Sequence, residues 1–152
     1  MFNQLAVVQA LKAWIAGLEV IEAGTTVAAI KEAFIGLNET IPSTPCAAVI
    51  IDSLADPSEY SINNCNQDIK ISVDILILVA VTRNLEADET ELLKLTDQAN
   101  LLLVDSTQPN SLDPTLGGLV GDTAYQGIQG YGVAEINSRA YRTARLRFEI
   151  TT

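Results

Sequence analysis

Histidine is absent from the 152-residue sequence, and cysteine occurs only at Cys46 and Cys65. The missing histidine removes the commonest general base and the commonest zinc ligand. Two cysteines alone cannot form a structural zinc site, and without secretion signals we interpret both as buried free thiols. We therefore expect no metal site.

Basic residues are also scarce, with 9 lysines and arginines against 19 aspartates and glutamates, so the formal net charge is −10. Binding to a phosphate backbone ordinarily needs clustered basic side chains, and an acidic protein repels DNA on average. An acidic wall nevertheless suits a channel along which DNA slides without sticking. The charge argues against specific DNA binding and is compatible with the passage of DNA.

The sequence has no long hydrophobic run. The longest nearly uncharged stretch, Leu5 to Leu18, contains Lys12 and is shorter than the about 20 apolar residues of a membrane span. Because it also lacks the features of a signal peptide, we expect a cytoplasmic protein with no membrane partner. The composition, 48% hydrophobic and 18% charged, predicts one globular domain, residues 1–152, with the weakly charged surface typical of a protein that has partners.

Nucleotide-binding motifs are absent as well. The glycine-rich stretches GGLVG (117–121) and GIQGYG (127–132) fit neither GxGxxG nor GxxxxGKS/T, and no lysine lies near them. Asp68 and Asp74 share a strand face but lie about 20 Å apart, too far for the paired carboxylates of a glycosidase. We expect no catalytic residue and no cofactor.

The first segment with a clear pattern is helical. Apolar residues recur every three or four positions between Leu5 and Leu18, which predicts an amphipathic helix that ends near Gly17. Trp14 widens this apolar stripe. Two roles are open for Trp14, core packing and the anchor of an interface.

A second helix is predicted in ADETELLKLTDQANLLLVD (87–105), where leucines recur at helical spacing. Asp88 as N-cap, with Glu91 three residues later, resembles a capping box. The pattern therefore predicts that this helix begins at Asp88.

Strands are predicted on both sides of the second helix. Strict alternation in DIKISVDILILVAVT (68–82) predicts a long strand with one fully apolar face. Its other face is polar up to Asp74 and apolar from Leu76, so we expect one wet end and one end buried on both sides. CAAVIID (46–52) reads as a second, buried strand.

Residues 25–45 are left open between two conformations. Their apolar spacing suits a helix, whereas their threonines and prolines suit extended chain.

Residues 113–132, DPTLGGLVGDTAYQGIQGYG, contain six glycines. Two interpretations are open: turns between strands, and a loop that lies flat against a neighbouring subunit. Overlapping this stretch, the segment TAYQGIQGYGVAEINSRAYRTARLRFEITT (123–152) reads as two strand-like runs joined near Asn137-Ser138. The whole pattern predicts an α+β fold, a single-domain sandwich in which two helices pack on one mainly antiparallel sheet.

Four of the 9 basic residues fall close together near the C-terminus: Arg139, Arg142, Arg145 and Arg147. Alternation places Arg145 and Arg147 side by side on a strand face that we expect to be exposed. One interpretation is a solvated face with acidic partners across the sheet. The other is an electrostatic seam, in which this basic face meets the acidic surface of an identical neighbour.

Taken in order, these segments resemble the phage tail terminator, or tail-completion, family. The resemblance lies in the N-terminal amphipathic helix, the strand PCAAVIID, the long strand DIKISVDILILVAV, the leucine-rich helix, the DPTLGGLV loop and the terminal strand ARLRFEI. It covers most of the chain and is closest at Leu116-Gly117-Gly118-Leu119-Val120. The open segment 25–45 departs from the pattern, because similar proteins tend to be extended there.

This resemblance implies a structural protein and not an enzyme. The chain would cap the tail tube as a hexameric ring, end tail elongation and then offer a surface to the head-side connector. Its partners would be further copies of itself, the tail tube protein, the connector or neck protein and, in a contractile tail, the sheath protein. DNA would pass through the lumen without specific binding. The protein would lie in the host cytoplasm during assembly and in the tail or neck of the virion afterwards.

Ten positions are predicted to contact a neighbouring subunit or the tube: Trp14, Leu116, Gly117, Gly118, Leu119, Val120, Arg139, Arg142, Arg145 and Arg147. Two other hypotheses remain open. One is a neck or head-to-tail connector protein, whose ring lies one layer nearer the capsid. The other is a small-molecule-binding domain, or a small enzyme using carboxylates, with its pocket beneath the 113–132 loop.

Overall fold

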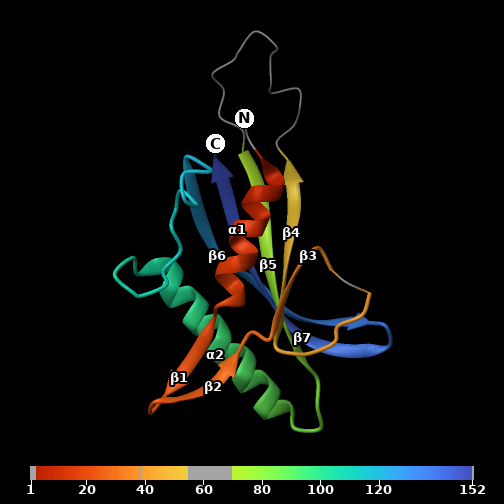
Figure 1. The fold of residues 1–152 in the computed structure, drawn as a ribbon. Coiled ribbons are helices and arrows are strands. Elements are labelled where there is room, and N and C mark those ends of the chain that lie inside the picture. Colours follow the sequence, from red (N-terminus) through yellow and green to blue (C-terminus); the bar gives the residue numbers. More distant parts are fainter. Residues whose placement is uncertain (1–2, 38, 55–69, 152) are drawn as a thin grey trace.

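The computed structural model describes residues 3–37, 39–54 and 70–151, whose arrangement is shown in Figure 1. They form α1 (Gln4–Ala16), β1 (Glu19–Glu22), β2 (Thr25–Ala29), β3 (Glu32–Ile35), β4 (Cys46–Leu54), β5 (Lys70–Ala80), α2 (Leu85–Val104), β6 (Asp122–Ile136) and β7 (Arg139–Thr151). Cys65 and the predicted strand start at Asp68 lie outside the described residues. Neither α1 nor α2 is long and apolar enough to cross a membrane.

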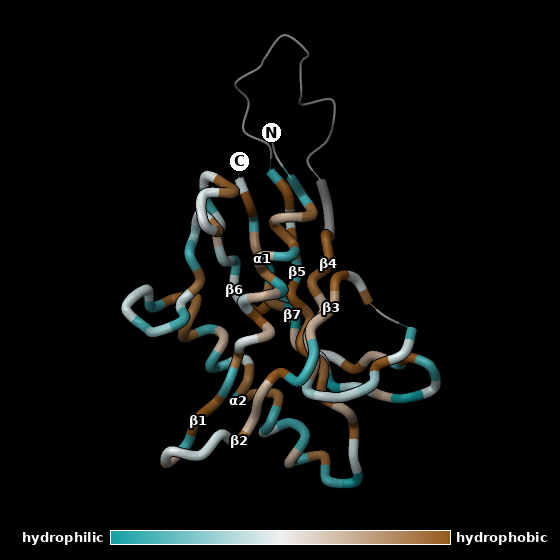
Figure 2. The backbone as a smooth tube through the Cα atoms, viewed as in Figure 1, coloured by the Kyte–Doolittle hydropathy of each residue, from teal (hydrophilic) through white to brown (hydrophobic). Residues whose placement is uncertain are grey.

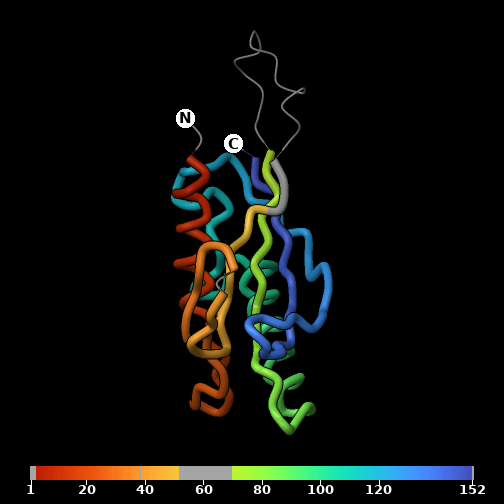
Figure 3. The backbone as a smooth tube through the Cα atoms, turned by 90° about the vertical axis from the view of Figure 1, so that its right-hand side faces the viewer, coloured from red at the N-terminus to blue at the C-terminus, as the bar shows by residue number. Residues whose placement is uncertain are grey.

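Five strands form one sheet in the order β3-β4-β5-β7-β6, and β1 and β2 form a separate hairpin. Neighbours in the large sheet are antiparallel, except for the parallel pair β3 and β4. Helix α1 packs against β3 and β4, and α2 packs against β5 and β7. Figure 3 shows α1 as a layer beside the strands. The predicted α+β class, with two helices on a mainly antiparallel sheet, is confirmed.

The alternation in β5 organises the core. Five alternate residues of β5 face the helices and are at most 2% exposed: Ile71, Val73, Ile75, Ile77 and Val79. They meet the buried stripes of the two helices, which include Val7, Val8, Leu11, Ile15, Leu92, Leu95 and Ala99. On the other sheet face, Leu76 and Leu78 pack in a smaller cluster with Ile41 and Tyr141. Figure 2 shows hydrophobic residues along the central strands and hydrophilic residues in several of the outer turns.

Residues 25–45, which the sequence left open, contain the strands β2 and β3 and, where they are described, no helix. Strand β2 pairs with β1, and β3 pairs with β4. Backbone hydrogen bonds continue from Lys31 N–H to Pro45 O and from Gly36 N–H to Val49 O, both at 2.8 Å. Pairing with β1 and β4 thus overrides the helical spacing, because the apolar spacing within 25–45 does not contain the partner strands.

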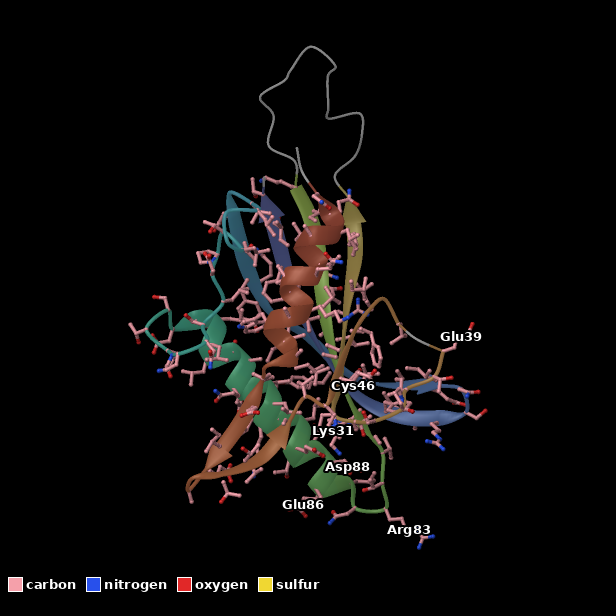
Figure 4. All side chains as sticks on the ribbon, in the orientation of Figure 1. Lys31, Glu39, Cys46, Arg83, Glu86 and Asp88 are labelled. Carbon is pink, nitrogen blue, oxygen red and sulfur yellow. The ribbon has the colours of Figure 1, made fainter. Side chains whose placement is uncertain are left out.

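Helix α2 begins one turn earlier than predicted. Its N-cap is Asn84, whose side chain accepts a hydrogen bond from Ala87 N–H at 3.1 Å. Asp88, the predicted N-cap, lies inside the helix, where it is buried (Figure 4). Its carboxylate accepts hydrogen bonds from the backbone N–H and the hydroxyl of Thr82, at 2.6 and 2.7 Å. The predicted capping box is wrong, because the Asp88 side chain binds Thr82, which precedes the helix, and does not cap it.

Residues 122–132 belong to the edge strand β6, which confirms the strand-like run predicted from Thr123 and shows that the docking-loop interpretation is wrong for this part. Its pairing with β7 shifts register twice, just before Gly127 and just before Gly130. Gly127 has a φ of +89°, which side chains with a Cβ rarely permit, so glycine allows the bulge. Only 113–121 form the loop. The predicted turn between β6 and β7 is confirmed.

Candidate subunit interface

The four C-terminal arginines divide between the two faces of β7. Arg142 has the same parity as the core residues Ala144 and Leu146, so it lies on the helix face, where it forms an ion pair with Glu89 of α2. Arg145 and Arg147 lie on the opposite face. The fourth, Arg139, is exposed at the end of the hairpin formed by β6 and β7. The four side chains therefore do not form one continuous basic patch.

Asp74 joins Arg145 and Arg147 on the sheet face away from the helices. Arg145 Nη1 donates to Asp74 Oδ2 at 2.8 Å, and Arg147 Nε donates to Asp74 Oδ1 at 2.9 Å. The Asp74 side chain is 1% exposed, whereas those of Arg145 and Arg147 are 41% and 33% exposed. The expected wet end of β5 is therefore wrong at Asp74. Register explains the burial, because Asp74 lies directly opposite Arg147 and the two charges compensate each other.

Glycines of β6 lie beside these arginines. Gly127 pairs with Arg147, and Gly130 pairs with Arg145. Since glycine has no side chain, β6 does not cover the two guanidinium groups from this side, which agrees with their partial exposure. Arg145 and Arg147 therefore have an acidic partner on the neighbouring strand, as one of the two interpretations predicted. Part of each arginine side chain stays at the surface.

The 113–121 loop is organised from within. The Asp113 carboxylate accepts hydrogen bonds from Thr115 N–H, the Thr115 hydroxyl and Gly117 N–H, each at 2.9 Å. These bonds, first that of Thr115 N–H, hold the pKa of Asp113 below its usual value. The loop therefore has a defined shape without a neighbouring subunit.

Two of the predicted loop anchors belong to the protein's own core. Leu116 is 7% exposed and Val120 is 6% exposed, and both pack in the main hydrophobic cluster. Leu119 is 46% exposed, and Gly117 and Gly118 are also at the surface. Within this loop, Leu119 is thus the large apolar side chain that a neighbour could contact.

Trp14 also serves its own subunit. It is half-buried against the main core, and its Nε1–H donates a hydrogen bond to the backbone oxygen of Asn110 at 3.0 Å. This bond ties α1 to the segment after α2. The core-packing role accounts for both contacts.

The sequence did not single out the exposed apolar residues of β6. Tyr131 is 47% exposed and Val133 is 62% exposed, although both lie in a regular part of the strand after the second register shift. Strand β6 contains no lysine, arginine or proline, the residues that commonly protect an edge strand from further pairing. The sequence predicted a strand-like run here, but it did not show that this strand lies at the sheet edge, where the two side chains are exposed.

Cys46 is the cysteine among the described residues. Cys46, at the start of β4, is buried, and burial, together with the nearby Glu32, raises the pKa of its thiol to about 11 (Figure 4). The thiol therefore stays protonated and unreactive near neutral pH. Within the described ranges 3–37, 39–54 and 70–151, no three acidic, cysteine or histidine side chains gather as metal ligands would.

Comparison with known proteins adds no relative. No protein-family model matches the chain, and no curated protein matches it. The residues and the fold are therefore the basis for the function proposed below.

Proposed function

We propose that the chain is a structural virion protein that caps the phage tail tube as a hexameric ring and so ends tail elongation. The same ring would present a surface to the head-side connector and, in a contractile tail, to the last layer of sheath protein. In this proposal the protein lies in the host cytoplasm during assembly and in the tail or neck of the virion afterwards. No reaction is assigned to it.

The observation that carries the proposal is the apolar edge of the large sheet. A lone subunit exposes Tyr131 and Val133 on β6, beside a strand edge without basic or proline protection. A second copy that covers this edge buries apolar surface and supplies hydrogen-bond partners to the edge backbone. If the contact joins β6 to a different surface of the neighbour, its repetition by rotation produces a closed ring.

The charge distribution supports the same proposal. The chain has a net charge of −10, and three of its arginines are engaged with Asp74 or Glu89 inside the subunit. These arginines are therefore not free to neutralise other acidic side chains, and the outer surfaces keep an excess of negative charge. An acidic lumen wall lets DNA pass without specific binding.

Tube capping tests the function directly. Purified tube protein is polymerised with and without this protein, and tube lengths are measured by electron microscopy. We expect short capped tubes with the wild type and long tubes with the double variant Tyr131→Ser and Val133→Ser. Val104→Ser, which changes another exposed apolar side chain, on α2 and 70% exposed, is the matched control and should cap normally.

Two outcomes would contradict the proposal. If wild-type protein leaves tube growth unchanged, the terminator function is wrong, and binding to the head-side connector alone would favour the neck-protein hypothesis. If the double variant caps as well as the wild type while melting at the same temperature, the β6 edge is not the contact surface.

A further inference from the structure

A small cavity lies between the C-terminal end of α2, the segment that follows it, and the sheet. Its volume is about 150 Å³. Its apolar walls include Leu102 and Leu103 of α2, Leu112 of the following segment and Phe148 of β7. Its polar residues are Ser106 and, on β6, Thr123 and Tyr125. The lining does not include Tyr131 or Val133, the exposed pair of β6.

Two residues that line this cavity carry hydroxyl groups that lack hydrogen-bond partners within the described part of the chain. The atoms are Thr123 Oγ1 and Tyr125 Oη, and both are buried. Thr123 and Tyr125 are two positions apart on one strand, so they lie on the same sheet face and both line the cavity. A buried hydroxyl without a partner is costly, and native proteins generally provide one from protein, water or ligand.

The walls define what such a partner would be. None of the residues that line the cavity carries a charge at neutral pH. Burial raises the pKa of Tyr125 to about 12, so its phenol stays protonated and can donate a hydrogen bond. The Tyr125 and Phe148 rings pack with centroids 5.4 Å apart and tilted by 41°, so two aromatic rings contribute to the cavity wall.

We propose that this cavity binds a small neutral molecule, a single ring that carries one hydroxyl or carbonyl group. Its polar group pairs with the hydroxyls of Thr123 and Tyr125, and its ring lies against Phe148 and the leucines. An apolar cavity of about 150 Å³ accommodates one benzene ring, so the size agrees with this class of ligand. A charged ligand would lose its hydration without gaining an ionic partner.

A pair of probes that differ by one hydroxyl tests the proposal. The protein is titrated with p-cresol and with toluene, and binding is followed by amide NMR shifts at Thr123 and Tyr125 and by melting temperature. We expect p-cresol to bind at least tenfold more tightly than toluene. Thr123→Val and Tyr125→Phe should each remove most of that preference, because each variant keeps the shape and deletes a hydroxyl. Tyr141→Phe, which deletes a phenol hydroxyl on the opposite face of the sheet, should bind p-cresol as the wild type does.

Three results would reject the proposed ligand site. The first is the absence of p-cresol binding at millimolar concentration. The second is equal binding of p-cresol and toluene, which would show that the hydroxyls play no part. The third is a preference for p-cresol that survives in both Thr123→Val and Tyr125→Phe. If water alone occupies the cavity, p-cresol does not bind and Tyr125→Phe lowers the melting temperature, which also rejects the proposal.

Discussion

At the scale of single residues, Asp74 shows how a buried charge is accommodated in this sheet. Its side chain is 1% exposed and contacts two arginines, each of which keeps a third or more of its side chain in water. The arrangement avoids the full desolvation of a positive charge, since both guanidinium groups remain partly hydrated. The pairing could have been found from sequence only with the β5–β7 register, because Asp74 and Arg147 are far apart along the chain.

Replacement of this carboxylate should destabilise the fold. Asp74→Ala removes the partner that Arg145 and Arg147 share, and loss of a buried pair costs about 3–5 kcal/mol. Because both arginines are partly exposed, water should compensate in part, and we expect a loss of about 2–3 kcal/mol in urea unfolding. The matched control is Glu149→Ala, whose exposed pair with Lys70 spans 3.7 Å and should cost less than about 0.5 kcal/mol. Equal losses in the two variants would contradict this account of Asp74.

Because Arg145 and Arg147 pair with Asp74 inside the subunit, another arginine is needed to test a charged seam between subunits. Reversal of Arg145 and Arg147 would place new carboxylates beside Asp74 and disturb folding along with assembly. Arg139 is exposed at the hairpin end, so Arg139→Glu should reduce the mass of the assembled protein in light scattering and leave the melting temperature unchanged. An unchanged mass would reject Arg139 as part of the seam.

The Asp113 carboxylate makes the order of the 113–121 loop depend on pH. Its pKa is lowered in the folded protein from the usual 3.8, so its stabilising bonds are present above that value and are lost as pH falls through the folded pKa. We expect the protection of Gly117 N–H from hydrogen exchange to fall below pH 3.8, with β5 amides as the internal reference. Asp113→Asn should show reduced protection already at pH 7. Protection that is independent of pH, with β5 intact, would contradict this.

At the scale of elements, segments with a clear period were predictable and residues 25–45 were not. The alternation of β5 and the leucine stripe of α2 encode burial directly, and both predictions are confirmed. The strand-like runs joined near Asn137-Ser138 are confirmed as β6 and β7, whereas β3 was left open because only its pairing with β4 decides between helix and strand. The cap of α2 was placed at Asp88 because Thr82, its actual partner, lies before the helix.

The central position of β5 can be measured. Ile75 and Ile77 are both 0% exposed and face the helices, so Ile75→Ala and Ile77→Ala should each cost about 2–5 kcal/mol in urea unfolding. Leu93→Ala, at a residue of α2 that is 40% exposed, provides a comparison and should cost much less. Similar costs at all three positions would mean that the assigned core face of β5 is wrong.

At the scale of the whole molecule, the predicted interface set divides into two groups. Leu116, Val120 and Trp14 pack within their own subunit, whereas Leu119 and Arg139 lie exposed. Sequence identified the loop and the arginines but could not tell internal from external contacts, since both use the same residue types. The exposed pair Tyr131 and Val133 became visible only when the strand carrying them was placed at the sheet edge.

The most direct test of the ring is the mass of the protein in solution. Light scattering is recorded over a concentration series, with and without tail tubes preassembled from purified tube protein. The account predicts a discrete multiple near six subunits, either in solution or only on tube ends, where the repeated tube surface strengthens a weak contact. A protein that stays monomeric at every concentration and does not bind tubes would contradict it.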